Sequence, residues 1–222
     1  MIRLLYADES IRLFRELVAD GKVAGYLGYL KAHHKETGDH SERVGLVSID
    51  LGHENRHSGD ELRLLGYGGL LHDIGKYRIP LDILGKQGPL EPAEQRIMKG
   101  HPRLGFLELS ESGFEPEEVG QIVVAHHEYK KDPSPRAGMD RRQAQPQGQP
   151  LHGRQSLRDV ERRAPAGNIS ALAQLVAIAD ISDALASRRP YKPPWPRERV
   201  EQTLHEQFRG DSKYIEQIME RL

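Results

Sequence analysis

Cysteine is absent from the 222 residues of this sequence. Its absence excludes disulfide bridges, catalysis by a thiolate and zinc sites built on cysteine. No apolar run approaches the length of a membrane span, and the first residues turn acidic too soon for a signal peptide. We therefore expect a cytoplasmic protein that has no membrane partner.

An excess of charge of either sign is also missing, since 32 Lys and Arg residues face 33 Asp and Glu residues. This balance gives no indication of binding to a nucleic-acid polymer. The hydrophobic content of 37% and the mean hydropathy of -0.65 are typical of a globular chain. Its length suffices for one well-packed domain.

Strands with clear alternation of apolar and polar residues are not found, and neither are internal repeats. Apolar residues recur instead at helical spacing, so we expect an all-α fold. Asp39 and Glu42 fit a capping box, which would start a helix at His40. The expected helices cover residues 8–34 with a break near Gly21, and residues 40–51, 61–71, 91–99, 103–107, 115–124, 169–187, 197–208 and 213–222.

The stretch from residue 130 to 167 differs from the rest, because it is rich in Arg, Gln, Pro and Gly and poor in large apolar residues. Residues 136–163 hold seven arginines and three acids, a local net charge of +4. We expect a long basic loop there. The predicted division is an N-terminal helical extension over residues 1–25 and one domain over residues 26–222.

Histidine is the compositional oddity, with 11 residues in a chain that has no cysteine. The central stretch is Gly69-Leu70-Leu71-His72-Asp73-Ile74-Gly75-Lys76, in which an apolar helix ends in a His-Asp pair. Imidazole beside carboxylate suits a divalent transition metal, although a capped, solvated helix end is the commoner reading of such a pair. On a continued helix Lys76 would share a face with both residues and could meet an anion such as phosphate.

Other candidate ligands stand near helix ends or on inward faces along the chain. Asp180 follows Leu172 and Val176 at intervals of four, which directs its carboxylate toward the interior. A helical bundle commonly gathers ligands from separate helices in its core, and mixed N/O ligation favours iron, manganese, nickel or zinc. The predicted metal ligands are Glu36, His40, His72, Asp73, His101, His126, His127 and Asp180.

The order and local context of these residues resemble the HD superfamily of metal-dependent phosphohydrolases, and specifically its HD-GYP branch. The resemblance extends from about residue 26 to the end of the chain. The matching segments are residues 40–44, 71–76, 80–86, 101–105, 126–128 and 179–192.

The resemblance implies an HD-domain helical bundle with a multinuclear metal site in its core, holding two or three divalent ions, Fe or Mn. It implies hydrolysis of a cyclic dinucleotide, cyclic di-GMP first, to linear dinucleotide or GMP. Asp73 would bridge two ions and act in catalysis with Lys76. Glu36 would support a third ion, and Lys76, Arg189 and Lys192 would bind substrate phosphates.

The chain departs from the family after His126-His127-Glu128, where Asp132-Pro133-Ser134-Pro135 replaces the Gly-Tyr-Pro signature. Two alternatives therefore stay open. One is a catalytically weak metal-binding module that binds nucleotide, or a signalling protein through residues 130–167. The other is an HD phosphohydrolase for a different nucleotide.

Some residues of the same types are expected to be structural. Asp183 is predicted to bond a nearby helix end. Six histidines lack a comparable context and are predicted to lie at the surface: His33, His34, His53, His57, His152 and His205.

Overall fold

The computed structural model describes residues 6–131, 168–187 and 194–222. These residues form helices and no strand, and a lone antiparallel bridge joins Lys130 to Phe208. The all-α prediction is therefore confirmed for the described part of the chain. Of the predicted loop over residues 130–167, residues 132–167 lie outside it, and so do Arg189 and Lys192.

The helices follow in the order α1 (Asp8–Val18), α2 (Gly21–His33), α3 (Lys35–Glu54), α4 (Gly59–Leu71), the 3-10 helix η1 (Ile74–Arg78), α5 (Leu81–Leu84), α6 (Pro92–Met98), α7 (His101–Glu111), α8 (Glu118–Ala125), α10 (Asn168–Ala186), α11 (Arg197–Gln207) and α12 (Lys213–Arg221). The predicted break near Gly21 is confirmed. The predicted boundary between residues 25 and 26 falls inside α2, and the division into extension and domain stays a prediction.

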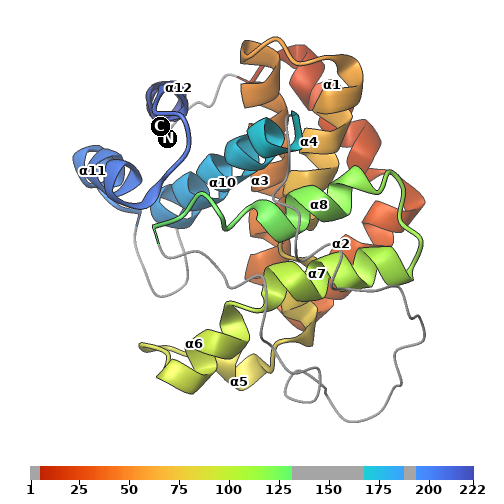
Figure 1. Cartoon of the computed structure of the whole chain (residues 1–222), viewed down its shortest axis with the longest axis vertical. Coiled ribbons are helices and arrows are strands. Elements are labelled where there is room, and N and C mark those ends of the chain that lie inside the picture. Colours follow the sequence, from red (N-terminus) through yellow and green to blue (C-terminus); the bar gives the residue numbers. More distant parts are fainter. Residues whose placement is uncertain (1–5, 132–167, 188–193) are drawn as a thin grey trace.

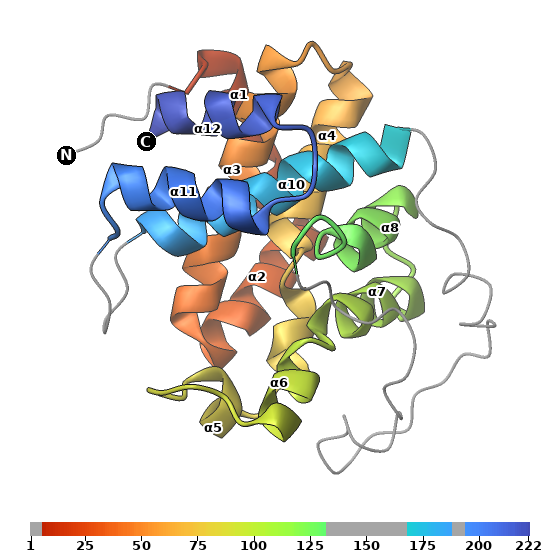
Figure 2. The ribbon, with the colours of Figure 1, turned by 60° about the vertical axis from the view of Figure 1, so that its left-hand side comes forward.

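Helix α10 lies in the middle of the bundle and packs against α3, α4, α8, α11 and α12 (Figure 1). Its residues from Leu172 to Ser182 are almost all buried. The expectation that no apolar run approaches the length of a membrane span was wrong, because α10 has the length and hydropathy of one. However, 56% of its apolar window is buried inside the bundle. It serves here as the central helix of the core, with α11 and α12 side by side along it (Figure 2).

The crossing of α3 and α4 depends on glycine. A Cβ atom on Gly69 would lie 2.7 Å from the Cα atom of Gly45 and 3.0 Å from its backbone nitrogen. Real Cβ atoms do not approach a backbone so closely, so the two helices meet at this distance because both residues lack a side chain. The crossing holds His40 on α3 and His72 after α4 in one region of the bundle.

A second close approach places α7. A Cβ atom on Gly75 would lie 2.0 Å from the carbonyl oxygen of His101 and 2.5 Å from the nitrogen of Gly105. Only glycine at this position lets η1 lie directly on the first turn of α7. His101, the first residue of α7, is thereby brought beside Asp73.

The capping box at Asp39 and Glu42 was a wrong prediction. Helix α3 already begins at Lys35, so both acids lie inside it. Asp39 pairs with Lys35 one turn earlier, and Glu42 accepts a hydrogen bond of 2.6 Å from Lys31 of α2. Because these lysines engage the carboxylates, the helix starts one turn earlier and His40 lies in its second turn.

The capping boxes that form are at the starts of α4 and α6. Ser58 accepts from the backbone of Glu61, whose side chain accepts from the backbone of Ser58. Glu91 and Glu94 form the second box, and Pro92 follows at the first helical position as expected. Helix α4 therefore begins two residues earlier than predicted, and α3 runs three residues further, to Glu54.

Candidate metal centre

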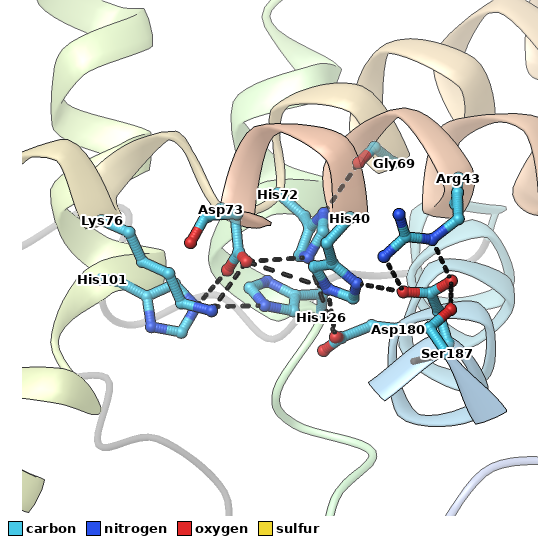
Figure 3. A network of polar contacts seen from close by, with 12 residues as sticks. His40, Arg43, Gly69, His72, Asp73, Lys76, His101, His126, Asp180 and Ser187 are labelled. Atoms are coloured by element: carbon cyan, nitrogen blue, oxygen red, sulfur yellow. Dashed lines mark hydrogen bonds and ion pairs between the residues drawn. The ribbon is translucent and has the colours of Figure 1, made fainter. Parts of the chain in front are cut away.

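Side chains of His and Asp residues on or at the ends of α3, α4, α7, α8 and α10 point toward one place (Figure 3). His40 comes from α3 and Asp180 from α10, both with the side chain facing the interior of the bundle. His72 ends α4, His101 begins α7 and His126 ends α8. The structure thus brings together seven of the eight predicted ligands in three overlapping groups: His101, His126 and His127; His40, His72 and Asp73; and His72, His126 and Asp180.

Three histidines are oriented by backbone carbonyls. The Nδ1 atoms of His72, His101 and His126 donate to the carbonyl oxygens of Gly69, Met98 and Val123, at 2.7, 2.8 and 2.7 Å. A carbonyl oxygen can only accept, so the proton of each neutral ring is on Nδ1. The Nε2 lone pairs are therefore left to face the cluster, as in metal sites whose ligands are held by outer partners.

The Nε2 atoms of His72, His101 and His126 lie close to one another and to the carboxylate of Asp73. His101 Nε2 lies 3.1 Å from Asp73 Oδ1 and 3.4 Å from His126 Nε2. His72 Nε2 is fully buried, lies 3.4 Å from Asp73 Oδ2 and has no hydrogen-bond partner. Buried lone pairs that face one another repel unless a cation lies between them. Nitrogen and carboxylate donors in this arrangement fit a divalent transition metal.

Burial and charge set the protonation of the cluster. Burial alone would raise the pKa of Asp73, but the adjacent imidazoles of His72 and His101 and the ammonium of Lys76 hold it well below its usual range. Burial lowers the pKa of His126 and of His127 well below the ordinary histidine value. Asp73 is therefore ionised and His126 and His127 are neutral, which are the forms that bind metal. At His40 burial would lower the pKa, but the hydrogen bonds with Asp180 and Asp183 raise it.

Two lysines contact the carboxylates from outside. Lys76 Nζ lies 2.7 Å from Asp73 Oδ2, and Lys130 Nζ lies 2.6 Å from Asp180 Oδ2. Both lysine side chains are about one-fifth exposed. Asp180 thus directs Oδ1 toward His40 Nε2, at 3.0 Å, while its other oxygen is held by Lys130. Lys130 was not singled out from the sequence.

Asp183 also has a larger role than the sequence indicated. It accepts from Ser187 at the end of α10, as predicted, but it also lies 2.6 Å from His40 Nδ1. Arg43 donates to both of its oxygens, at 2.7 and 2.9 Å. Helical spacing carried a signal for this network, because Arg43 follows His40 by three residues and Asp183 follows Asp180 by three.

The remaining predicted site residues lie apart from this cluster or outside the described residues. Glu36 is exposed, and its described ion pair is with His34, at 3.5 Å. Arg189 and Lys192 fall in the undescribed segment 188–193. Of the histidines predicted to be at the surface, His152 is undescribed, and none of the others belongs to a group that could hold a metal among the described residues.

Comparison with known proteins gives one family. The family model described as the HD domain matches residues 37–185. A 3'3'-cGAMP-specific phosphodiesterase 2 of Vibrio cholerae is 30% identical over 96% of this chain. A cyclic di-GMP phosphodiesterase of Thermotoga maritima is 39% identical over 74% of the chain, and a cyclic di-GMP phosphodiesterase response regulator of Xanthomonas campestris is 35% identical over 70%. The chain spans 37%, 38% and 34% of these relatives.

Proposed function

This chain belongs to the HD domain family, and from that membership we propose that it is a metal-dependent phosphodiesterase acting on a cyclic dinucleotide. The observation that carries the proposal is the convergence of five imidazoles on the ionised carboxylates of Asp73 and Asp180 in the core. The names of the relatives support the substrate class, and cyclic di-GMP is the first substrate to test. The Vibrio cholerae relative, which is similar over 96% of this chain, makes 3'3'-cGAMP the second.

Two ions would be held by the buried groups. His40, His72 and Asp180 would bind one, and His101, His126 and His127 would bind the other. Asp73 would serve both, because its Oδ1 faces His101 while its Oδ2 faces His72. Glu36 would contribute to a third ion. Iron or manganese fits the mixed donors. Such ions, when bound, polarise phosphoryl oxygens and lower the pKa of water.

The protein's own cations would bind the substrate. Lys76 is anchored to Asp73 and retains some exposure, so its ammonium can donate to a phosphate oxygen without leaving the cluster. Its charge offsets part of the negative charge that accumulates on a phosphodiester under attack. Arg189 and Lys192, which follow α10 in the sequence, are proposed as further phosphate contacts.

A second candidate function is supported by one observation, the Asp132-Pro133-Ser134-Pro135 segment in place of Gly-Tyr-Pro. In this alternative the protein retains metal and binds nucleotide or a signalling partner, with little turnover. A third is hydrolysis of another nucleotide. Cytoplasmic location and a protein contact through residues 130–167 remain part of the proposal.

The test uses protein purified without oxygen, whose metal is counted by elemental analysis before incubation with cyclic di-GMP or 3'3'-cGAMP. We expect about two or more ions per chain and linear dinucleotide or mononucleotide as product. Asp73→Ala should lose metal and product together. Asp60→Ala, an exposed acid on α4, should keep both. Metal without product from either compound would favour the binding module or another nucleotide, and metal at full stoichiometry in Asp73→Ala would refute the assignment.

A further inference from the structure

One histidine of the cluster is held differently from the others. His72, His101 and His126 each donate Nδ1–H to a neutral backbone carbonyl. His40 instead faces the carboxylate of Asp183, with 2.6 Å between Nδ1 and Oδ2. A carboxylate behind an imidazole makes the opposite ring nitrogen a stronger donor to a metal than a carbonyl does.

Asp183 is fixed for this contact by groups from two helices. Its Oδ2 receives His40 Nδ1 and Arg43 Nη2, and its Oδ1 receives Arg43 Nε and Ser187 Oγ. The side chain is 9% exposed. With both oxygens engaged, the carboxylate cannot rotate away from His40 without breaking the pair with Arg43.

The two halves of the cluster therefore differ in the carboxylates that surround them. The half around His40 and His72 has the carboxylate of Asp180 beside it and that of Asp183 behind it. The half around His101, His126 and His127 consists of imidazoles that share Asp73 as their near carboxylate. Lys130 and Arg43 balance the charges of these two carboxylates, so the difference lies in the ligands themselves. A carboxylate ligand and an imidazole supported by a carboxylate bind a divalent cation more strongly than imidazoles held by neutral carbonyls.

We propose that Asp183 is a positioning residue that makes the ion position at His40, His72 and Asp180 the tighter of the two. It acts through His40, whose tautomer and direction it fixes, and it touches neither substrate nor ion. This inference rests on the proposed metal binding. It predicts that the ions enter in two separate steps, and that the strength of the first step depends on Asp183.

The test is a titration of the full chain with Mn²⁺ after removal of metal with a chelator, with free Mn²⁺ followed by electron paramagnetic resonance. Wild type should show two affinities. Asp183→Asn should weaken the tighter step about tenfold to hundredfold, the range found for outer partners of metal ligands, and leave the other step within about twofold. Equal weakening of both steps, or none, would overturn the proposal.

Asp50→Asn is the matched control. Asp50 is also a buried acid paired with an arginine, Arg221, but its partners lie away from the cluster. If Asp183 only stabilised the fold, Asp183→Asn and Asp50→Asn would change the Mn²⁺ affinities in the same way. We expect Asp50→Asn to keep both Mn²⁺ affinities, and a loss in the tighter step equal to that of Asp183→Asn would overturn the inference.

A measurement on the wild type covers the case in which Asp183→Asn does not fold. In ¹⁵N-labelled protein without metal, long-range proton–nitrogen spectra of the imidazoles should show His40 protonated at Nδ1, with that proton shifted downfield by Asp183. A His40 ring protonated at Nε2 alone would overturn the inference. Wild type that binds no Mn²⁺ would refute the proposed function itself, whereas two equal affinities would refute only the inference.

Discussion

Helix α3 uses the same chemical unit, a buried aspartate paired with an arginine, at its two ends and for two purposes. Near its beginning, Arg43 of α3 holds Asp183 of α10. Near its end, Asp50 of α3 receives Arg221 of α12 through Nε and Nη2, at 3.0 and 2.9 Å. Each aspartate accepts four polar contacts, so the number of contacts does not distinguish them.

The donors other than arginine distinguish the two aspartates. Asp50 Oδ1 accepts from the backbone of Ala7 and from Ser10 Oγ, both at 3.0 Å, so all of its partners join α1 and α12 to α3. At Asp183 one donor is His40, whose other nitrogen faces the cluster. One Asp–Arg pair therefore stabilises the fold, whereas the other is connected to the candidate metal centre through a single imidazole.

The largest expected effect comes from disrupting the crossing of α3 and α4, which fixes the position of α3 as a whole. Gly69→Val would place a branched side chain against the backbone of Gly45 at the crossing of α3 and α4. We expect loss of cooperative folding and of metal binding, because overpacking against backbone cannot be relieved by a rotamer change. Thermal unfolding followed by circular dichroism measures it. Gly28→Val, at an open position of α2, should unfold as wild type does.

Removing the Asp50–Arg221 pair near the end of α3 should lower the stability of the fold and leave metal binding unchanged. Asp50→Asn removes the charge that holds Arg221 and weakens the contacts to Ala7 and Ser10. Removing one partner of a buried ion pair lowers the free energy of unfolding by about 3 kcal/mol. Urea unfolding measures this loss, and metal content should stay at the wild-type value. A drop in bound metal without a drop in stability would contradict the contrast between the two ends.

The smallest expected effect concerns the turn that follows α3, where Glu61 closes the capping box of α4. A hydrogen bond from the Ser58 backbone is the main reason that the pKa of Glu61 falls from 4.5 to about 2. Since the folded pKa is the lower one, its contribution is complete above about pH 4.5 and is lost as the pH falls toward 2. Glu61→Gln should therefore lower the free energy of unfolding at pH 6, by about 0.5 kcal/mol, and make little difference at pH 2.5. An equal difference in the free energy of unfolding between wild type and Glu61→Gln at both pH values would contradict this prediction.

Most of the helices and the members of the cluster could be predicted from the sequence, because helical spacing and short motifs are local signals. His72 and Asp73 stand together in the chain, and Asp180 shares a stripe with Val176. The start of α3 could not be predicted, since Asp39 has the spacing of a cap but its carboxylate pairs with Lys35. The ion pair with Lys35, four residues earlier, favours a helix that contains Asp39 over a helix that Asp39 caps.

The contacts that surround the metal ligands could not be predicted from the sequence for a different reason. Asp183 and His40 are 143 residues apart, and Lys130 and Asp180 are 50 apart. Nothing local indicates that such residues meet, because their distance depends on the helix crossings. The close approach at Gly75 is similar, since its need for glycine arises only when α7 lies against it.

The two stems that flank residues 132–167 are tied together. Tyr129 and Ser170, one on each stem, share a hydrogen bond of 2.5 Å between their hydroxyl oxygens. The backbone of Lys131 also donates to Gln207 of α11, at 2.7 Å. In polymer terms the ends of this segment are already joined, and doubling the length of such a closed segment costs only about 0.6 kcal/mol in entropy. Lengthening the chain between Tyr129 and Ser170 should therefore cost little stability.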